Sequence, residues 1–129
     1  MIVDTSAVLA ILRNEPDARR YATVLAASER TRMSAGNWLE AANVVDSRRD
    51  PIGSRRFDEL IAQAGIEIVP VTPAQAAVAR QAYRDFGKGS GHAAQLNFGD
   101  CFAYALASEA GEPILFKGND FVHTDLQPA

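Results

Sequence analysis

Short apolar runs alternate along the chain with longer amphipathic segments, and this alternation predicts the secondary structure. Strands are expected at residues 2–3, 32–34, 66–71 and 114–116, with a weaker edge strand at 121–126. Helices are expected at residues 7–13, 17–28, 36–46, 51–64, 73–86 and 99–110. Strands that alternate with helices favour a parallel sheet with helices on both faces, which places the chain in the α/β class.

Acidic residues stand at the ends of several of these segments. Asp4 directly follows the first expected strand, Asp100 begins a helix that is apolar on every side, and Asp120 follows the last well-marked strand. Ligands in open α/β sheets bind outside the carboxyl ends of the strands, so these positions are candidates for one site. A fourth acid, Glu40, lies in a helix that is apolar almost all round and is expected to be buried, with Asn43 one turn later as its partner.

Each of these acids also has an ordinary structural interpretation. Asp4 and Asp100 stand where an N-cap is favoured, and Glu40 would simply be exposed on its helix. Asp120 lies in a Gly-Asn-Asp sequence that is typical of turns, and Asn119 and Asp125 are alternatives for its role in a site. For the first helix the expected cap is Thr or Ser at positions 5 and 6, so the cap does not require the preceding acid.

Clustered acids without matching Lys or Arg residues indicate a site for a hard cation. Mg²⁺ and Mn²⁺ prefer carboxylate and water oxygens, and such an ion polarises a phosphodiester and lowers the pKa of a bound water. Thr5 and Ser6 are expected to hydrogen-bond a water on the metal or a phosphate. The constellation therefore predicts metal-dependent phosphoryl chemistry.

Composition and charge limit the remaining possibilities. The 129 residues, of which 47% are hydrophobic, fit a single folded domain that spans residues 1–129. The net charge of −3 argues against a generally basic nucleic-acid binder, but the arginines occur in clusters, as at residues 48–49 and 55–56. A single cysteine, no signal segment and no apolar stretch long enough for a membrane span lead us to expect a cytoplasmic protein without a membrane partner.

Other motifs are weak. The glycine-rich segment 87–91 lacks the spacing of a phosphate-binding loop and is expected to be a flexible loop at the rim of the site, where Lys88 and His92 could touch a phosphate. The two histidines have no zinc-ligand spacing. Cys101, within an apolar helix, is interpreted as a core residue and not as a nucleophile.

Taken together, the segments resemble the PIN-domain ribonucleases and, within them, the VapC toxins of bacterial toxin–antitoxin pairs. The resemblance covers essentially the whole chain and is carried by residues 1–7 (Met-Ile-Val-Asp-Thr-Ser-Ala), Trp38-Leu39-Glu40-Ala41, Gly99-Asp100-Cys101 and residues 115–121. It implies a three-layer α/β/α domain with a short parallel central sheet. It also implies an Mg²⁺- or Mn²⁺-dependent endoribonuclease that cuts structured RNA such as tRNA or rRNA.

The resemblance also implies residue roles and partners. Asp4, Glu40 and Asp100 match the metal-binding acids of the family, and we assign Asp120 as the acid that completes the catalytic set. Many relatives place that acid two positions earlier, where this chain has Gly118. A homodimer and a cognate antitoxin protein that blocks the active site are implied as partners.

Two other hypotheses remain at this stage. One is a phosphoryl-transfer or receiver-like α/β domain that uses Asp4 as a nucleophile or phosphate acceptor. The other is a catalytically silent module whose acidic cluster binds a metal or a basic partner. A covalent phosphate on Asp4 would identify the first hypothesis, and metal binding without RNA cleavage would favour the second.

Overall fold

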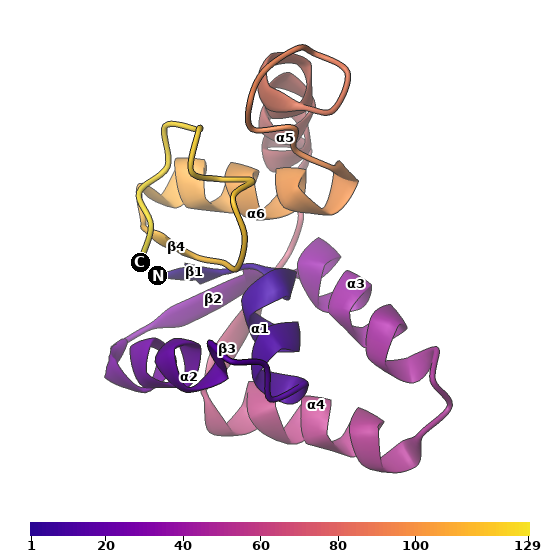
Figure 1. Ribbon diagram of the computed structural model, residues 1–129. Coiled ribbons are helices and arrows are strands. Elements are labelled where there is room, and N and C mark those ends of the chain that lie inside the picture. Colours follow the sequence, from indigo (N-terminus) through magenta and orange to yellow (C-terminus); the bar gives the residue numbers. More distant parts are fainter.

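A parallel sheet forms the centre of the molecule in the computed structural model, which describes residues 1–129 (Figure 1). Its strand order is β3-β2-β1-β4. The strands are β1 (Ile2–Val3), β2 (Thr31–Ser34), β3 (Ile66–Val69) and β4 (Ile114–Leu115). The N-terminal strand β1 therefore lies inside the sheet, between β2 and the last strand.

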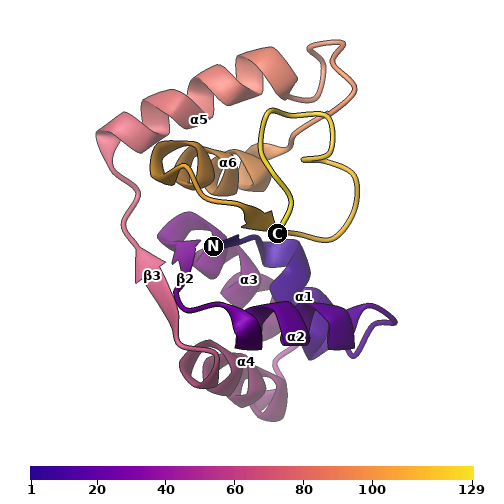
Figure 2. The ribbon, with the colours of Figure 1, turned by 90° about the vertical axis from the view of Figure 1, so that its left-hand side faces the viewer.

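Six helices cover the sheet in two layers. They are α1 (Thr5–Leu12), α2 (Ala18–Ala27), α3 (Ala35–Asp46), α4 (Pro51–Gln63), α5 (Pro73–Phe86) and α6 (Phe98–Ala110). Figure 2 shows α6 lying against one face of the sheet with α5 outside it, while α1, α2 and α4 lie on the opposite side. This arrangement confirms the three-layer α/β/α architecture expected from the sequence.

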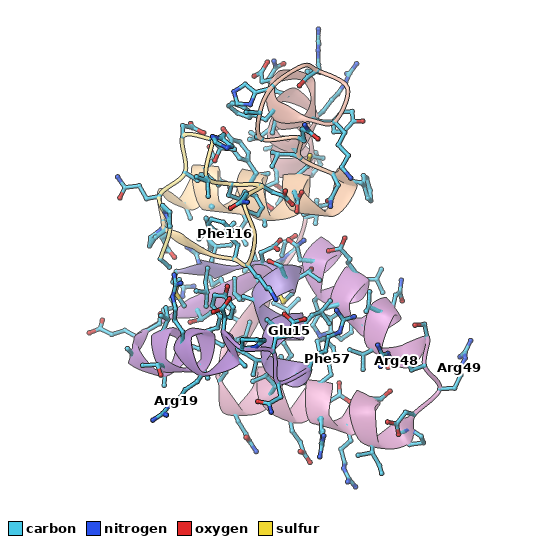
Figure 3. All side chains as sticks on the ribbon, viewed as in Figure 1. Glu15, Arg19, Arg48, Arg49, Phe57 and Phe116 are labelled. Carbon is cyan, nitrogen blue, oxygen red and sulfur yellow. The ribbon has the colours of Figure 1, made fainter.

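Each face of the sheet has its own hydrophobic core. Val3, Met33 and Leu115 pack with side chains from α1 to α4, and among these Phe57 points inward from α4 (Figure 3). Ile2 pairs with Ile114 in parallel register and packs on the other face with α6 and the C-terminal segment. The alternation of neighbouring strand residues between the two faces follows the two-residue period of a strand.

Local signals explain where most helices begin and end. Ser34, Asp50 and Thr72 each cap a helix by accepting a hydrogen bond from a backbone N–H in its first turn. Gly111 ends α6 in the left-handed conformation with φ of 64°, which glycine adopts without steric cost. No helix is both long enough and apolar enough to cross a membrane.

Two of the sequence expectations about these elements are wrong. Residues 121–126 form turns and not an edge strand, and the only pairing near them is an isolated bridge between Ile114 and Pro128. The first helix begins at Thr5, with Asp4 as its N-cap, because the Asp4 side chain accepts from the Ser6 amide. The carboxylate of Asp4 therefore has a structural contact as well as its place at the end of β1.

Candidate functional site

A polar hollow of about 510 Å³ opens at the carboxyl end of β1 and β4. The four acids expected from the sequence all line it, although they are up to 116 positions apart in the chain (120 − 4). The lining residues are Asp4, Thr5, Ser6, Leu9, Arg13, Glu15, Glu40, Val44, Asn97, Asp100, Lys117, Gly118 and Asp120. Asn119 and Asp125, the alternatives to Asp120, do not line the hollow. Asp125 instead accepts a hydrogen bond from the Tyr104 hydroxyl at 2.7 Å.

Asp4 is held at the floor of the hollow by the turn that follows it. Its side chain is buried, and its Oδ2 accepts from the Ser6 amide at 2.9 Å and from the Ser6 hydroxyl at 2.5 Å. The same hydroxyl oxygen accepts from the amide of Lys117 at 2.9 Å. Ser6 therefore connects Asp4 to the segment that leaves β4, and the loop carrying Asp120 is tied to the first acid.

Asp100 is fixed by a capping box at the start of α6. The Asn97 side chain accepts from the Asp100 amide at 2.8 Å, and the Asp100 carboxylate accepts from the Asn97 amide at 2.9 Å. The N-cap of α6 is thus Asn97. The sequence had allowed Asp100 to be the cap, and the structure places Asp100 in the first turn instead. The polar residue three positions before an acid is a sequence signal that could have identified this cap.

Glu40 approaches the site from α3 and is only partly buried. Its carboxylate lies over the backbone of Gly99, because a β-carbon built on that glycine would stand 1.9 Å from Glu40 Oε2. The expectation that Asn43 supports Glu40 fails, since Asn43 is exposed. The buried amide on this helix is Asn37, one turn earlier, whose Nδ2 donates to the Gly99 carbonyl at 2.8 Å.

The environment makes two of these acids hard to ionise. Burial raises the pKa of Asp4 to about 6, against the opposing effect of the Ser6 hydrogen bonds. Burial also raises the pKa of Asp100 to about 7, and contact with the carboxyl of Asp120 and the charge of Asp4 add to this rise. A hollow that keeps acids at this electrostatic cost has the character of a functional site.

Nearby cations do not neutralise these acids. Lys117 is ion-paired with Glu15 at the rim, and Arg13, also at the rim, has no ion-pair partner in the structure. The donors are all carboxylate and hydroxyl oxygens, which fit Mg²⁺ or Mn²⁺ and not a soft metal. The acids do not converge as ligands in the structure, because no group of three or more His, Cys, Asp or Glu side chains is arranged to hold an ion.

The other candidates from the sequence lie away from this hollow. His92 packs edge-on against Phe86 and accepts the Ala94 amide on Nδ1, and neither it nor Lys88 lines the hollow. Cys101 is buried, and burial raises the pKa of its thiol to about 11, which is consistent with a core residue.

Comparison with known proteins agrees with this geometry. Residues 1–126 match the family model described as PIN domain. The chain is 58% identical over its whole length to Ribonuclease VapC28 from Mycobacterium tuberculosis, of which it covers 97%. The crystal structure of M. tuberculosis VapC20, described as a Sarcin-Ricin loop cleaving toxin, has a TM-score of 0.75 and 14% identity, with 99% of this chain and 97% of that chain covered.

A second solved structure has the same fold and comes from a complex. It is described as a toxin–antitoxin complex from Klebsiella pneumoniae, with a TM-score of 0.71 and 14% identity, covering 96% of this chain and 92% of that chain. The resemblance inferred from the sequence motifs is thereby confirmed: the chain belongs to the PIN-domain family and, within it, to the VapC ribonucleases.

Proposed function

We propose that this chain is an Mg²⁺- or Mn²⁺-dependent endoribonuclease that acts as the toxin of a toxin–antitoxin pair and cuts structured RNA such as tRNA or rRNA. The observation that carries the proposal is the hollow lined by Asp4, Glu40, Asp100 and Asp120 without a cationic partner among them. Membership of a ribonuclease family supports the reaction class, and an all-oxygen donor set supports the kind of ion.

The acids have different roles in this proposal. Asp4 and Asp100 are the principal metal ligands, Glu40 is a further ligand or orients a water, and Asp120 completes the catalytic set. Thr5 and Ser6 support the site by hydrogen bonding, and Ser6 already holds Asp4 by two bonds. When bound, the ion supplies charge to polarise the phosphodiester and to lower the pKa of an attacking water.

The raised pKa values of Asp4 and Asp100 give the metal site a dependence on pH. A carboxyl group must lose its proton before it can bind the ion, so metal affinity is expected to rise as pH increases through about 6 to 7. The backbone hydrogen bonds from Ser6 and Asn97 hold the two carboxylates in place while they change protonation state.

The RNA backbone is proposed to cross the rim of the hollow at Arg13. This side chain is exposed, lines the hollow and has no ion-pair partner, which leaves its guanidinium available to a phosphate. The description of VapC20 as a toxin that cleaves the Sarcin-Ricin loop supports structured RNA as the substrate class.

A cognate antitoxin is proposed to bind the groove that adjoins the hollow. This groove of about 370 Å³ between α1, α3 and α4 is lined by aliphatic side chains that include Leu12 and Val45. Three arginines, Arg13, Arg48 and Arg56, also line it, together with one acid, Asp50, which caps α4. The groove suits an apolar segment with acidic residues, because the aliphatic side chains and the guanidiniums need complementary groups. Figure 3 shows Arg48 near the link between α3 and α4. The description of the Klebsiella structure as a toxin–antitoxin complex supports an antitoxin as the partner.

A homodimer and a cytoplasmic location remain part of the proposal. Phe98 is 78% exposed and Leu39 is 54% exposed, on two helices that pack against each other. Large exposed apolar side chains on neighbouring elements favour a protein interface there.

The first experiment is cleavage of total RNA by the purified chain with Mn²⁺, beside the Asp100→Asn variant, with sequencing of the fragment ends. Asn at position 100 can still accept the Asn97 amide, so the capping contact and the fold are expected to persist. Discrete cuts by the wild type alone support the proposal and identify the target. Cuts by both proteins contradict the assignment of Asp100, and bound metal with no cuts favours a silent module.

A further inference from the structure

Asn37, which is not one of the four acids, lies on the helix that carries Glu40 and contacts the segments that carry Asp4 and Asp100. Asn37 on α3 is fully buried. Its Nδ2 donates to the carbonyl of Gly99, the residue before Asp100, at 2.8 Å. Its backbone carbonyl accepts from the hydroxyl of Thr5, the residue after Asp4, at 3.1 Å. Asn37 therefore joins the segments that carry Asp4 and Asp100 to the helix that carries Glu40.

Stability does not account for this amide. Asn37 Oδ1 is buried and has no hydrogen-bond partner within the protein. An unsatisfied buried acceptor costs about 1–3 kcal/mol, whereas an apolar side chain of similar size leaves no such group. Because the amide is only half satisfied, its contribution is to be sought in the bond that it donates to Gly99.

That bond meets the Glu40 carboxylate at the same residue, Gly99. The carbonyl oxygen of Gly99 accepts the hydrogen bond from Asn37. The carboxylate of Glu40 lies over the Gly99 α-carbon, where a β-carbon would stand 1.9 Å from Glu40 Oε2. The contact of α3 with Gly99 therefore sets how far the Glu40 carboxylate lies from the first turn of α6, which carries Asp100.

We propose that Asn37 is a positioning residue for RNA cleavage, because its bond to Gly99 fixes the placement of the Glu40 helix against the first turn of α6, which carries Asp100. The inference rests on the proposed function for the reaction itself. It does not give Asn37 a contact with the RNA, since the side chain is enclosed by protein.

The test replaces Asn37 with Leu, which has a similar size and lacks the amide. Cleavage rate at saturating RNA, KM, Mn²⁺ affinity by calorimetry and the urea midpoint are measured for each protein. Asn37→Leu is expected to lower kcat and Mn²⁺ affinity by roughly 10- to 100-fold, as loss of such supporting contacts does, with the urea midpoint unchanged or higher. Asn43→Leu, which replaces an exposed amide on the same helix, is the matched control and is expected to leave all four quantities unchanged.

A second variant tests the same contact from the other side. Gly99→Ala places a methyl group where the Glu40 carboxylate lies, so it is expected to lower kcat and Mn²⁺ affinity as well. Because both changes disturb the placement of α3 against Gly99, the double variant is expected to lose little beyond the larger single loss. Additive losses would contradict a shared action through Gly99.

The remaining outcomes are also decisive. Unchanged kcat and Mn²⁺ affinity in Asn37→Leu would overturn the positioning role, as would a loss of activity that merely follows a loss of folded protein. If the wild type itself cuts no RNA, the proposed function fails, and the Mn²⁺ affinities alone then decide whether Asn37 positions the acids.

Discussion

Asp4→Asn is expected to make the metal-free protein more stable at neutral pH, although it removes a proposed catalytic group. Asn can accept the hydrogen bonds from Ser6 that Asp4 accepts now, and Asn and Asp are about equally good N-caps. What the substitution removes is the negative charge of a carboxylate that is 3% exposed. The change therefore separates the cost of the charge from the value of the cap.

The magnitude follows from the pKa of Asp4. Burial raises the pKa from 3.8 to about 6, a difference of roughly 2 units, which corresponds to about 3 kcal/mol at most. The folded state binds more protons than the unfolded state between these two values, so the free energy of unfolding falls as pH rises through this window. The higher pKa of Asp100, about 7, extends the same trend toward neutral pH.

The assay is urea unfolding in EDTA, followed by circular dichroism at pH 4 and pH 8. The free energy of unfolding of Asp4→Asn is expected to exceed that of the wild type by about 1–3 kcal/mol at pH 8 and to differ little from it at pH 4. Asp58→Asn, which removes an exposed acid from α4, is the control and is expected to show no such gain. A variant that is less stable than the wild type at pH 8, or a difference that does not change with pH, would refute the reasoning.

Three further predictions follow from individual contacts. Gly36→Ala should destabilise the protein by about 1–3 kcal/mol in urea unfolding, because the new β-carbon would lie 2.7 Å from the Phe102 ring; an unchanged midpoint would contradict the tight packing of α3 on α6. Gly111→Ala should cost about 1 kcal/mol, since φ at that position is 64°, and a calorimetric Tm equal to that of the wild type would argue against the left-handed C-cap. Asp120→Asn should abolish most RNA cleavage while Asp125→Asn retains it. Loss of cleavage in Asp125→Asn with retention in Asp120→Asn would assign the catalytic role to Asp125 instead.

The architecture was predictable because the hydrophobic pattern is strong along most of the chain. The run at 66–69 and the caps at Thr72 and Gly111 all predicted elements that the structure contains. The pattern at 121–126 was misleading, because Phe121 is packed into the core from a turn and not from a strand. Periodicity reports which residues are buried, and a turn can bury a side chain as well as a strand does.

The candidate site was predictable in its acids and not in their supports. Three acids at segment ends and Glu40 within a helix were visible in the sequence, but the side of α3 that faces α6 was not. Asn37 and Asn43 are both amides within one turn of Glu40, and only the packing of α3 decides that the first is buried and the second exposed. The bond from Asn37 to Gly99 spans 62 positions, and no local pattern encodes such a contact.

The strand order has a consequence for the time at which the site forms during synthesis. β1 emerges from the ribosome before the other three strands, yet its partner β4 is made 112 positions later (114 − 2). A nascent chain that ends after α5 has Asp4 and Glu40 but neither Asp100 nor Asp120. Since contacts between distant segments form only once both exist, the four acids come together only after Asp120 has been translated. A chain that stops before Asp120 therefore carries an incomplete site, so any activity that needs all four acids is withheld until that residue has been made.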